Sequence, residues 1–191
     1  MTDLSLGAGV HADAAGRSHG SVAAHSPPLI RPARPADAAA IAEVHVRAWQ
    51  AAYEHVFGAE RLAAIDHTRR RTLAERAIAS GNVAVAEENG KVVGFVSVGP
   101  STDVDGEGEL FAIYVLPEAW GSGAGPRLMA AAKELLRASY TDATLYVLED
   151  NPRARRFYER EGWALDGVTK ADEFLGMPVL EVRYRIRLTP A

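Results

Sequence analysis

The amino-acid sequence predicts one α/β domain, in which strands and helices alternate along the chain. Apolar runs rich in β-branched and aromatic residues are separated by stretches whose apolar residues recur at helical spacing. The 191 residues fit one domain with a sizeable core, and 48% of them are hydrophobic, as in an ordinary globular protein. The expected strands are 29–33, 82–87, 92–98, 109–116, 143–148, 164–170 and 180–188, and the expected helices are 37–53, 59–79, 128–137 and 152–161.

Turn signals support several of these boundaries. Asn89-Gly90 predicts a tight hairpin between the second and third strands. Asn151 followed by a proline is typical of a helix start, and Gly162 is typical of a helix end. Segment 1–28 is rich in Ala, Gly and Ser and lacks the basic start and apolar run of a signal peptide. We therefore expect a disordered tail at 1–28 and a folded domain at 29–191.

Charge and composition argue against several classes of protein. The net charge of -4 argues against a general nucleic-acid binder and permits a cationic substrate. The absence of cysteine excludes disulfides, thiolate metal sites and a cysteine nucleophile, and is consistent with a reducing compartment. No apolar run approaches the length of a membrane span. We therefore expect a cytoplasmic protein that binds neither nucleic acid nor membranes.

The rest of the chain is arranged around a glycine-rich turn between the strand 109–116 and the helix 128–137. The first N–H groups of a helix have no partner inside the helix and carry partial positive charge, so they bind anions. Glycines in the turn remove the Cβ atoms that would keep a phosphate away from these groups. The turn therefore predicts a ligand that carries phosphate. Its residues are Trp120, Gly121, Ser122, Gly123, Ala124 and Gly125.

The spacing of the turn differs from two common nucleotide-binding motifs. A P-loop has Lys and then Ser or Thr after its last glycine, where this chain has Pro126 and Arg127. A dinucleotide fingerprint has a third glycine where Pro126 stands. Proline is compatible with the first helical turn, because its missing N–H would have no intrahelical partner there. A Rossmann-type nucleotide site is thus the weakest interpretation.

The turn resembles the acyl-CoA pyrophosphate loop of the GNAT superfamily of N-acetyltransferases. In that loop Gln or Arg is followed by two variable residues, Gly, one variable residue, and Gly or Ala. Gly123 and Gly125 match, whereas Trp120 stands where Gln or Arg is usual and Pro126 replaces a frequent Arg. The segment 151–163 matches a second superfamily motif, with its Asn, Ala, Phe-Tyr and Gly-aromatic positions. The two motifs occur in the expected order and separation.

The resemblance covers residues 30–188 and implies both fold and activity. It implies the GNAT fold, with a mixed, mostly antiparallel, twisted sheet of about six to seven strands flanked by about four helices. It also implies transfer of the acetyl group of acetyl-CoA, the co-substrate, to a primary amine. The amine would attack directly in a ternary complex, without a covalent enzyme intermediate and without a metal.

The resemblance also implies roles for individual residues. Tyr158 takes the place of the acid that protonates the leaving thiolate. Glu109 takes the place of the general base, often acting through water, with Glu107 and Glu149 as rivals. A main-chain donor on the central strand would stabilise the oxyanion. The cofactor-binding residues that the resemblance implies are Tyr114, Val115, Trp120, Gly121, Ser122, Gly123, Ala124, Gly125, Arg127 and Asn151.

The sequence leaves the acceptor and the assembly open. Trp49 and Tyr53 lie on one face of the helix 37–53 and are expected either to pack in the core or to wall the acceptor pocket. The acidic loop 100–108 is expected either to be a mobile polar loop or to attract an amine cation. The acceptor would be a small-molecule or peptide amine, and a homodimer through the C-terminal strands is a family habit. Because Trp120 and Pro126 depart from the family pattern, the alternative function is a non-catalytic acyl-CoA-binding or sensing module.

Overall fold

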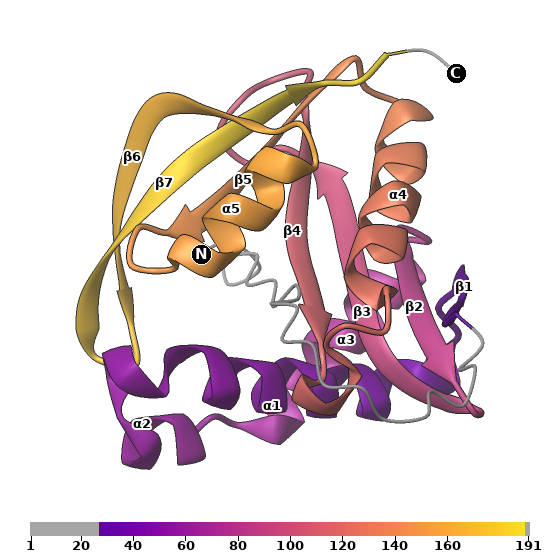
Figure 1. Cartoon of the computed structure of the whole chain (residues 1–191), viewed down its shortest axis with the longest axis vertical. Coiled ribbons are helices and arrows are strands. Elements are labelled where there is room, and N and C mark those ends of the chain that lie inside the picture. Colours follow the sequence, from indigo (N-terminus) through magenta and orange to yellow (C-terminus); the bar gives the residue numbers. More distant parts are fainter. Residues whose placement is uncertain (1–26, 190–191) are drawn as a thin grey trace, which may run out of the picture.

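The computed structural model describes residues 27–189 and shows a seven-stranded sheet flanked by helices (Figure 1). The predicted tail, 1–28, lies outside the described residues except for its last two. The strands are β1 (Leu29–Pro32), β2 (Val83–Glu88), β3 (Lys91–Pro100), β4 (Gly108–Val115), β5 (Asp142–Leu148), β6 (Ala164–Phe174) and β7 (Met177–Arg187). The helices are α1 (Ala38–Phe57), α2 (Ala59–Ala63), α3 (His67–Ala79), α4 (Ala124–Arg137) and α5 (Pro152–Arg160), with 3-10 turns η1 (Pro35–Asp37) and η2 (Pro117–Ala119).

The sheet has the strand order β1-β2-β3-β4-β5-β7-β6. All neighbouring strands are antiparallel except β4 and β5, which are parallel. The expected mixed, mostly antiparallel sheet is therefore confirmed. The register of β4 with β5 includes only Gly108 opposite Ala143 and Glu109 opposite Thr144. Beyond Glu109 the two strands separate, and Figure 1 shows β5 and α5 diverging from β4.

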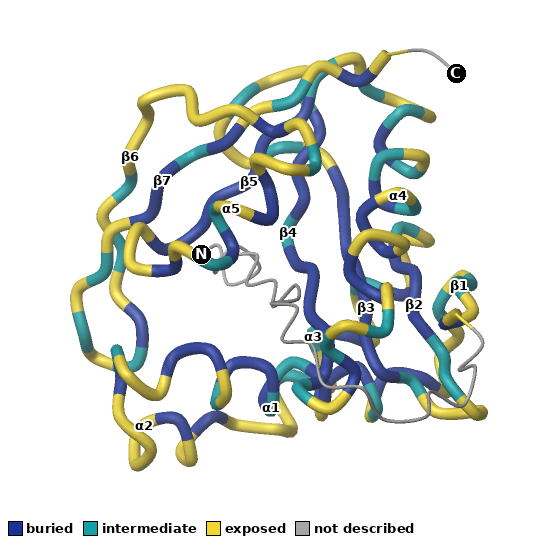
Figure 2. Tube along the Cα trace, viewed as in Figure 1, coloured by how far each residue is buried: buried dark blue, intermediate teal, exposed yellow. Residues whose placement is uncertain are grey.

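Helices cover both faces of the sheet, with α4 on one face and α1 with α3 on the other. Gly94 of β3 shows how closely α4 approaches, because a Cβ atom there would lie 2.8 Å from the Tyr114 carbonyl oxygen and 3.0 Å from Leu128 of α4. The next residue, Phe95, points to the opposite face, where its ring centroid lies 6.1 Å from that of His45 on α1. Figure 2 shows the strands between these helices as the most buried part of the chain.

The structure corrects the expected helix 59–79, which is divided into α2 and α3. The Asp66 carboxylate accepts hydrogen bonds from the backbone N–H groups of Thr68 (2.8 Å) and Arg69 (3.1 Å). This N-cap satisfies the first donors of α3 and so starts a new helix. The apolar periodicity of the segment did not reveal the break. No helix between residues 27 and 189 combines the length and apolar character that crossing a bilayer would need.

The hairpin turns follow the expected chemistry. Asn89 and Gly90 have φ angles of 50° and 76°, the left-handed values that a two-residue hairpin requires. A second such turn at Leu175 and Gly176, with φ angles of 50° and 74°, joins β6 to β7. These two strands extend further toward that turn than the expected ranges 164–170 and 180–188. The strand β6 forms one edge of the sheet and is mostly exposed (Figure 2).

Candidate active site

The separation of β4 from β5 leaves an open strand edge at Val115. Val115 lies opposite Gly94, and the neighbouring Leu116 N–H donates to the Val93 carbonyl at 2.8 Å. In an antiparallel ladder this pattern makes Val115 and Gly94 a non-hydrogen-bonded pair, whose backbone groups point away from each other. The N–H and C=O of Val115 are thus directed toward the gap between β4 and β5. The carbonyl accepts a hydrogen bond from Trp120 Nε1 at 3.0 Å.

The glycine-rich turn lies at the same end of β4 and leads directly into α4. Gly121 and Gly123 have φ angles of 85° and 88°, so both positions favour glycine. A Cβ atom on Gly123 would meet nothing within 4 Å, so the space beside the turn is open. Between the turn and α5 lies a cleft of about 280 Å³. Among the residues that line the cleft are Val115, Trp120, Gly121, Gly123, Ala124 and Gly125.

One positive charge at this cleft belongs to a residue that the sequence analysis missed. Arg127 is exposed on α4 and is not among the residues lining the cleft, whereas Arg160 of α5 is. Arg160 lies three residues after Phe157, which also lines the cleft, and residues at this spacing share a helix face. This spacing could have identified Arg160 as a residue of the cleft. Lys133 of α4 donates to the Glu161 carbonyl at 2.7 Å and to the Glu161 carboxylate at 3.2 Å. This contact fixes α5 against α4 beside the cleft.

The predicted acid, Tyr158, is fully buried on α5. Burial raises the pKa of its phenol well above 10, and the neighbouring Tyr114 and Tyr53 raise it further. The phenol is therefore protonated at neutral pH, as a proton donor must be. The structure brings the three tyrosines from α5, β4 and α1 into one cluster.

Trp49 and Tyr53, the predicted walls of the acceptor pocket, connect α1 to both sides of the gap. Trp49 Nε1 donates to the Tyr114 hydroxyl at 2.8 Å, and Asn151 Nδ2 donates to the Tyr53 hydroxyl at 2.9 Å. Both α1 side chains are fully buried. Core packing, one of their two expected roles, is therefore present, and contact with an acceptor stays a prediction.

Asn151 has the structural role expected of it. Its Oδ1 accepts the backbone N–H of Ala154 at 3.0 Å, which makes it the N-cap of α5. Its amide also binds the Tyr53 hydroxyl, so one side chain starts α5 and connects that helix to α1. Its proposed contact with the cofactor stays a prediction.

The candidate base, Glu109, lies at the closed end of the gap, where β4 and β5 are still paired. Its side chain is buried, and its Oε2 accepts hydrogen bonds from the Thr102 backbone N–H (2.9 Å) and the Thr102 hydroxyl (3.1 Å). Val115 is six positions further along β4, which is about 20 Å for a fully extended strand. Of its rivals, Glu107 forms an ion pair with Arg185 and Glu149 is exposed.

A further carboxylate, Glu181 of β7, lies nearer the open end of the gap. Glu109 is opposite Thr144, so four residues further along both strands Leu148 is level with Ile113. Glu181 pairs with Leu148 and therefore lies at this level too. Glu181 is fully buried. Burial raises the pKa of Tyr53, and the charge of Glu181 acts in the same direction. The sequence analysis missed it because the alternating strand 180–188 suggested a polar, solvent-facing side.

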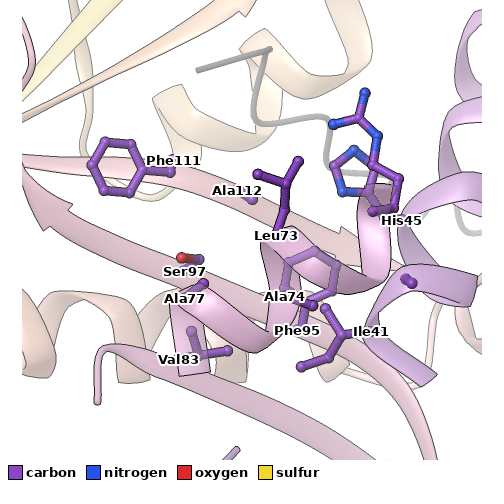
Figure 3. Close-up of a pocket in the computed structure, with 12 residues that line it drawn as sticks. Ile41, His45, Leu73, Ala74, Ala77, Val83, Phe95, Ser97, Phe111 and Ala112 are labelled. Atoms are coloured by element: carbon purple, nitrogen blue, oxygen red, sulfur yellow. The ribbon is translucent and has the colours of Figure 1, made fainter. Parts of the chain in front are cut away.

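A small pocket lies on the face of β4 that α1 and α3 cover (Figure 3). It encloses about 50 Å³, and its lining is mainly apolar, with side chains such as Ile41, Phe95 and Phe111. His45 also lines it and stacks on the Tyr114 ring, with ring centroids 4.8 Å apart. Burial lowers the pKa of His45 to about 3, and the nearby Arg70 acts in the same direction. The imidazole is therefore neutral at physiological pH.

The chain is similar to known proteins in sequence and in fold. The model of the acetyltransferase (GNAT) family matches residues 39–163. An uncharacterised N-acetyltransferase of Bacillus subtilis is 30% identical over 162 residues, covering 79% of this chain and 93% of that protein. A Salmonella typhimurium protein solved with its cofactor acetyl-CoA has a TM-score of 0.67 and 22% identity, covering 87% of this chain and 96% of that one. A ribosomal-protein-alanine N-acetyltransferase of Brucella melitensis has a TM-score of 0.66 and 25% identity, covering 84% and 99%.

The chain therefore belongs to the acetyltransferase (GNAT) family, and its enzyme class is that of the acetyl-CoA-dependent N-acetyltransferases. The fold that the sequence motifs implied is confirmed by these structural neighbours. From residue 27 to residue 189, His, Asp and Glu side chains form no cluster of three that could hold a metal ion.

The neutral state of His45 predicts how stability depends on pH. In the unfolded chain the imidazole takes up a proton below its ordinary pKa of 6.5, but in the folded protein its pKa is about 3. The unfolded state thus binds more protons between these values, and the free energy of unfolding should fall as pH is lowered. From pH 7 to pH 5 we expect His45 to contribute about 2 kcal/mol of this fall.

Urea unfolding at several pH values tests this expectation with the His45→Gln variant. The variant should lose about 2 kcal/mol of the pH-dependent change, whatever its stability at pH 7. His67→Gln is the control, because the His67 side chain is 57% exposed. Equal pH dependence in the parent and His45→Gln would contradict the assignment.

Proposed function

We propose that this enzyme transfers an acetyl group from acetyl-CoA to a primary amine by direct attack in a ternary complex. The observation that carries the proposal is the position of the open edge at Val115, next to the glycine-rich turn at the start of α4. One ligand with phosphates at one end and amide groups along an arm fits both features. Acetyl-CoA has this chemistry and supplies the thioester that the amine attacks.

The residues of the cleft suit the two ends of such a ligand. The backbone N–H groups at the start of α4 and the positive end of the helix dipole favour phosphate, and Arg160 adds a positive charge. The open edge of β4 favours an extended, amide-containing chain, which can pair with it as a neighbouring strand would. The cleft therefore fits the nucleotide end, and the gap fits the arm.

The chain offers groups for two parts of the reaction. The Val115 N–H, directed into the gap, is a donor for the carbonyl oxygen that gains charge on attack. Tyr158 can pass its phenolic proton to the departing thiolate, because its raised pKa keeps it protonated. We assign the oxyanion role to Val115 and the acid role to Tyr158.

The acceptor approaches from the face of β4 that carries α1 and α3, opposite α4. This face holds the small pocket beside His45, and it also holds Glu109, because its partner on β3 is two residues after Ser97 of the pocket lining. We propose that the acceptor is a small-molecule or peptide amine. We also propose that Trp49 and Tyr53 hold the wall of its pocket in place through their hydrogen bonds with Tyr114 and Asn151.

A cytoplasmic location and a homodimer stay predictions from the sequence.

Substitution of Tyr158 by phenylalanine tests the acid role together with the overall activity. We expect acetyl-CoA affinity within about twofold of the parent and a loss of turnover of about 100-fold, because the proton donor is removed while the ring remains. Titration calorimetry gives the affinity, and release of the CoA thiol with pooled primary amines gives the turnover. Tyr140→Phe is the matched control, since Tyr140 packs beside Gly108 at the closed end of the sheet.

Two results would contradict this account in different ways. If the parent protein failed to bind acetyl-CoA, or bound it without releasing CoA with any pool, the proposed function would be wrong. Unchanged turnover in Tyr158→Phe, with an active parent, would remove Tyr158 from the mechanism and leave the acetyltransferase activity standing.

Substitution of each candidate carboxylate by glutamine distinguishes the two possible bases. If Glu109 is the general base and acts through water, Glu109→Gln should lower kcat/KM about 100-fold and alter its pH profile. Glu181→Gln would show this loss instead if the buried carboxylate near the open end accepts the proton. Urea unfolding of both variants controls for folding, because each carboxylate is buried. A loss of less than threefold in both would show that neither is the base.

A further inference from the structure

Trp120 donates a hydrogen bond to a backbone carbonyl that faces the proposed cofactor site. Its indole Nε1–H donates to the Val115 carbonyl at 3.0 Å, and its ring lines the cleft beside the glycine-rich turn. An indole has one hydrogen-bond donor and no acceptor, so the residue can make this contact only as a donor. The contact closes a short loop, because Val115 ends β4 and Trp120 lies five residues later, after η2.

Arg153 holds the indole in this position from the other side of the gap. Its guanidinium carbon lies 4.3 Å from the centroid of the Trp120 ring, within the range of a cation–π contact. Arg153 belongs to the first turn of α5, which follows β5, whereas Trp120 follows β4. The pair therefore bridges the two strands at the end where they have separated.

The indole lies in the part of the gap that an extended ligand arm would enter, because it contacts Val115 of β4 and Arg153 of α5. The Val115 carbonyl is directed toward the gap, where an extended ligand chain would pair with it as a strand would. The arm of acetyl-CoA contains two amide N–H groups, and each is the same type of donor as the indole N–H. The carbonyl oxygen has two lone pairs, so the competition is for the space beside it and not for the acceptor alone. A ligand arm that pairs with Val115 would enter the place that the indole holds between β4 and Arg153 of α5.

We propose that Trp120 is an internal competitor for acyl-CoA, and that its indole must leave the gap before the ligand arm can pair with β4. This inference rests on the proposed binding of acetyl-CoA. Trp120 acts through the Val115 carbonyl and sets the affinity, so it is a positioning residue. In the absence of ligand the indole satisfies the carbonyl and, with Arg153, keeps the two sides of the gap connected.

The Trp120→Phe variant separates the hydrogen bond from the ring. Phenylalanine keeps an aromatic face for Arg153 but cannot donate to Val115. We expect the Kd for acetyl-CoA, measured by titration calorimetry, to fall about fivefold, because the ring is no longer held across the gap by its hydrogen bond to Val115. The matched ligand is adenosine 3′,5′-bisphosphate, which has phosphates but no amide arm, and its affinity should change by less than about twofold.

Tryptophan fluorescence gives a second measurement on the parent protein. The chain has three tryptophans, and Trp49 and Trp163 are only 1% and 2% exposed. Release of Trp120 from Arg153 should therefore change the emission when acetyl-CoA is added, and the change should be absent in Trp120→Phe.

The outcomes separate this inference from the proposed function. An equal or weaker affinity of Trp120→Phe for acetyl-CoA, with a parent that binds, would overturn the inference alone. An equal gain with adenosine 3′,5′-bisphosphate would also overturn it, because the effect would then come from the phosphate end. If neither protein bound acetyl-CoA, both the inference and the proposed function would be wrong.

Discussion

The site depends on one feature of the sheet, which is that β4 and β5 are paired at only two positions. Past Glu109 and Thr144 the strands separate, although both continue for several residues. A backbone N–H or C=O that is removed from water without a partner costs about 1–3 kcal/mol, so the edge that faces the gap requires partners. The indole of Trp120 supplies one for Val115, and an extended amide ligand would supply more. The separation thus creates both the space and the hydrogen-bonding groups of the site.

Side chains from outside the two strands hold this gap at its observed shape. On the β4 side, Trp49 of α1 donates to the Tyr114 hydroxyl. At the start of α5, the Asn151 amide donates to the hydroxyl of Tyr53, also on α1, so one helix spans the separation. On the other face, Lys133 of α4 binds Glu161 just after α5. These contacts are buried or half-buried, where an unmade hydrogen bond is costly, so they keep α5 at a fixed place relative to β4.

The sequence predicted the elements well because their signals are local. The hairpin at Asn89-Gly90, the cap at Asn151 and the glycine turn each depend on residues close together in the chain. The cap at Asp66 was missed, because the surrounding apolar residues kept a helical period. Arg160 and Glu181 were missed as site residues because their positions follow from packing between elements far apart in the sequence. The indole contact of Trp120 could not be predicted either, since it depends on the direction of a strand-edge carbonyl.

Hydrogen exchange of single backbone amides, measured by NMR with and without acetyl-CoA, tests most directly whether the β4 edge is the binding surface. We predict that exchange of the Val115 amide slows at least about tenfold when acetyl-CoA is added, because the ligand arm covers and pairs with that edge. The Tyr114 amide, which lies in the ladder with Phe95 of β3, should change much less. Binding of acetyl-CoA that left the Val115 amide unchanged would show that the arm lies elsewhere, and the central role of the open edge would be contradicted.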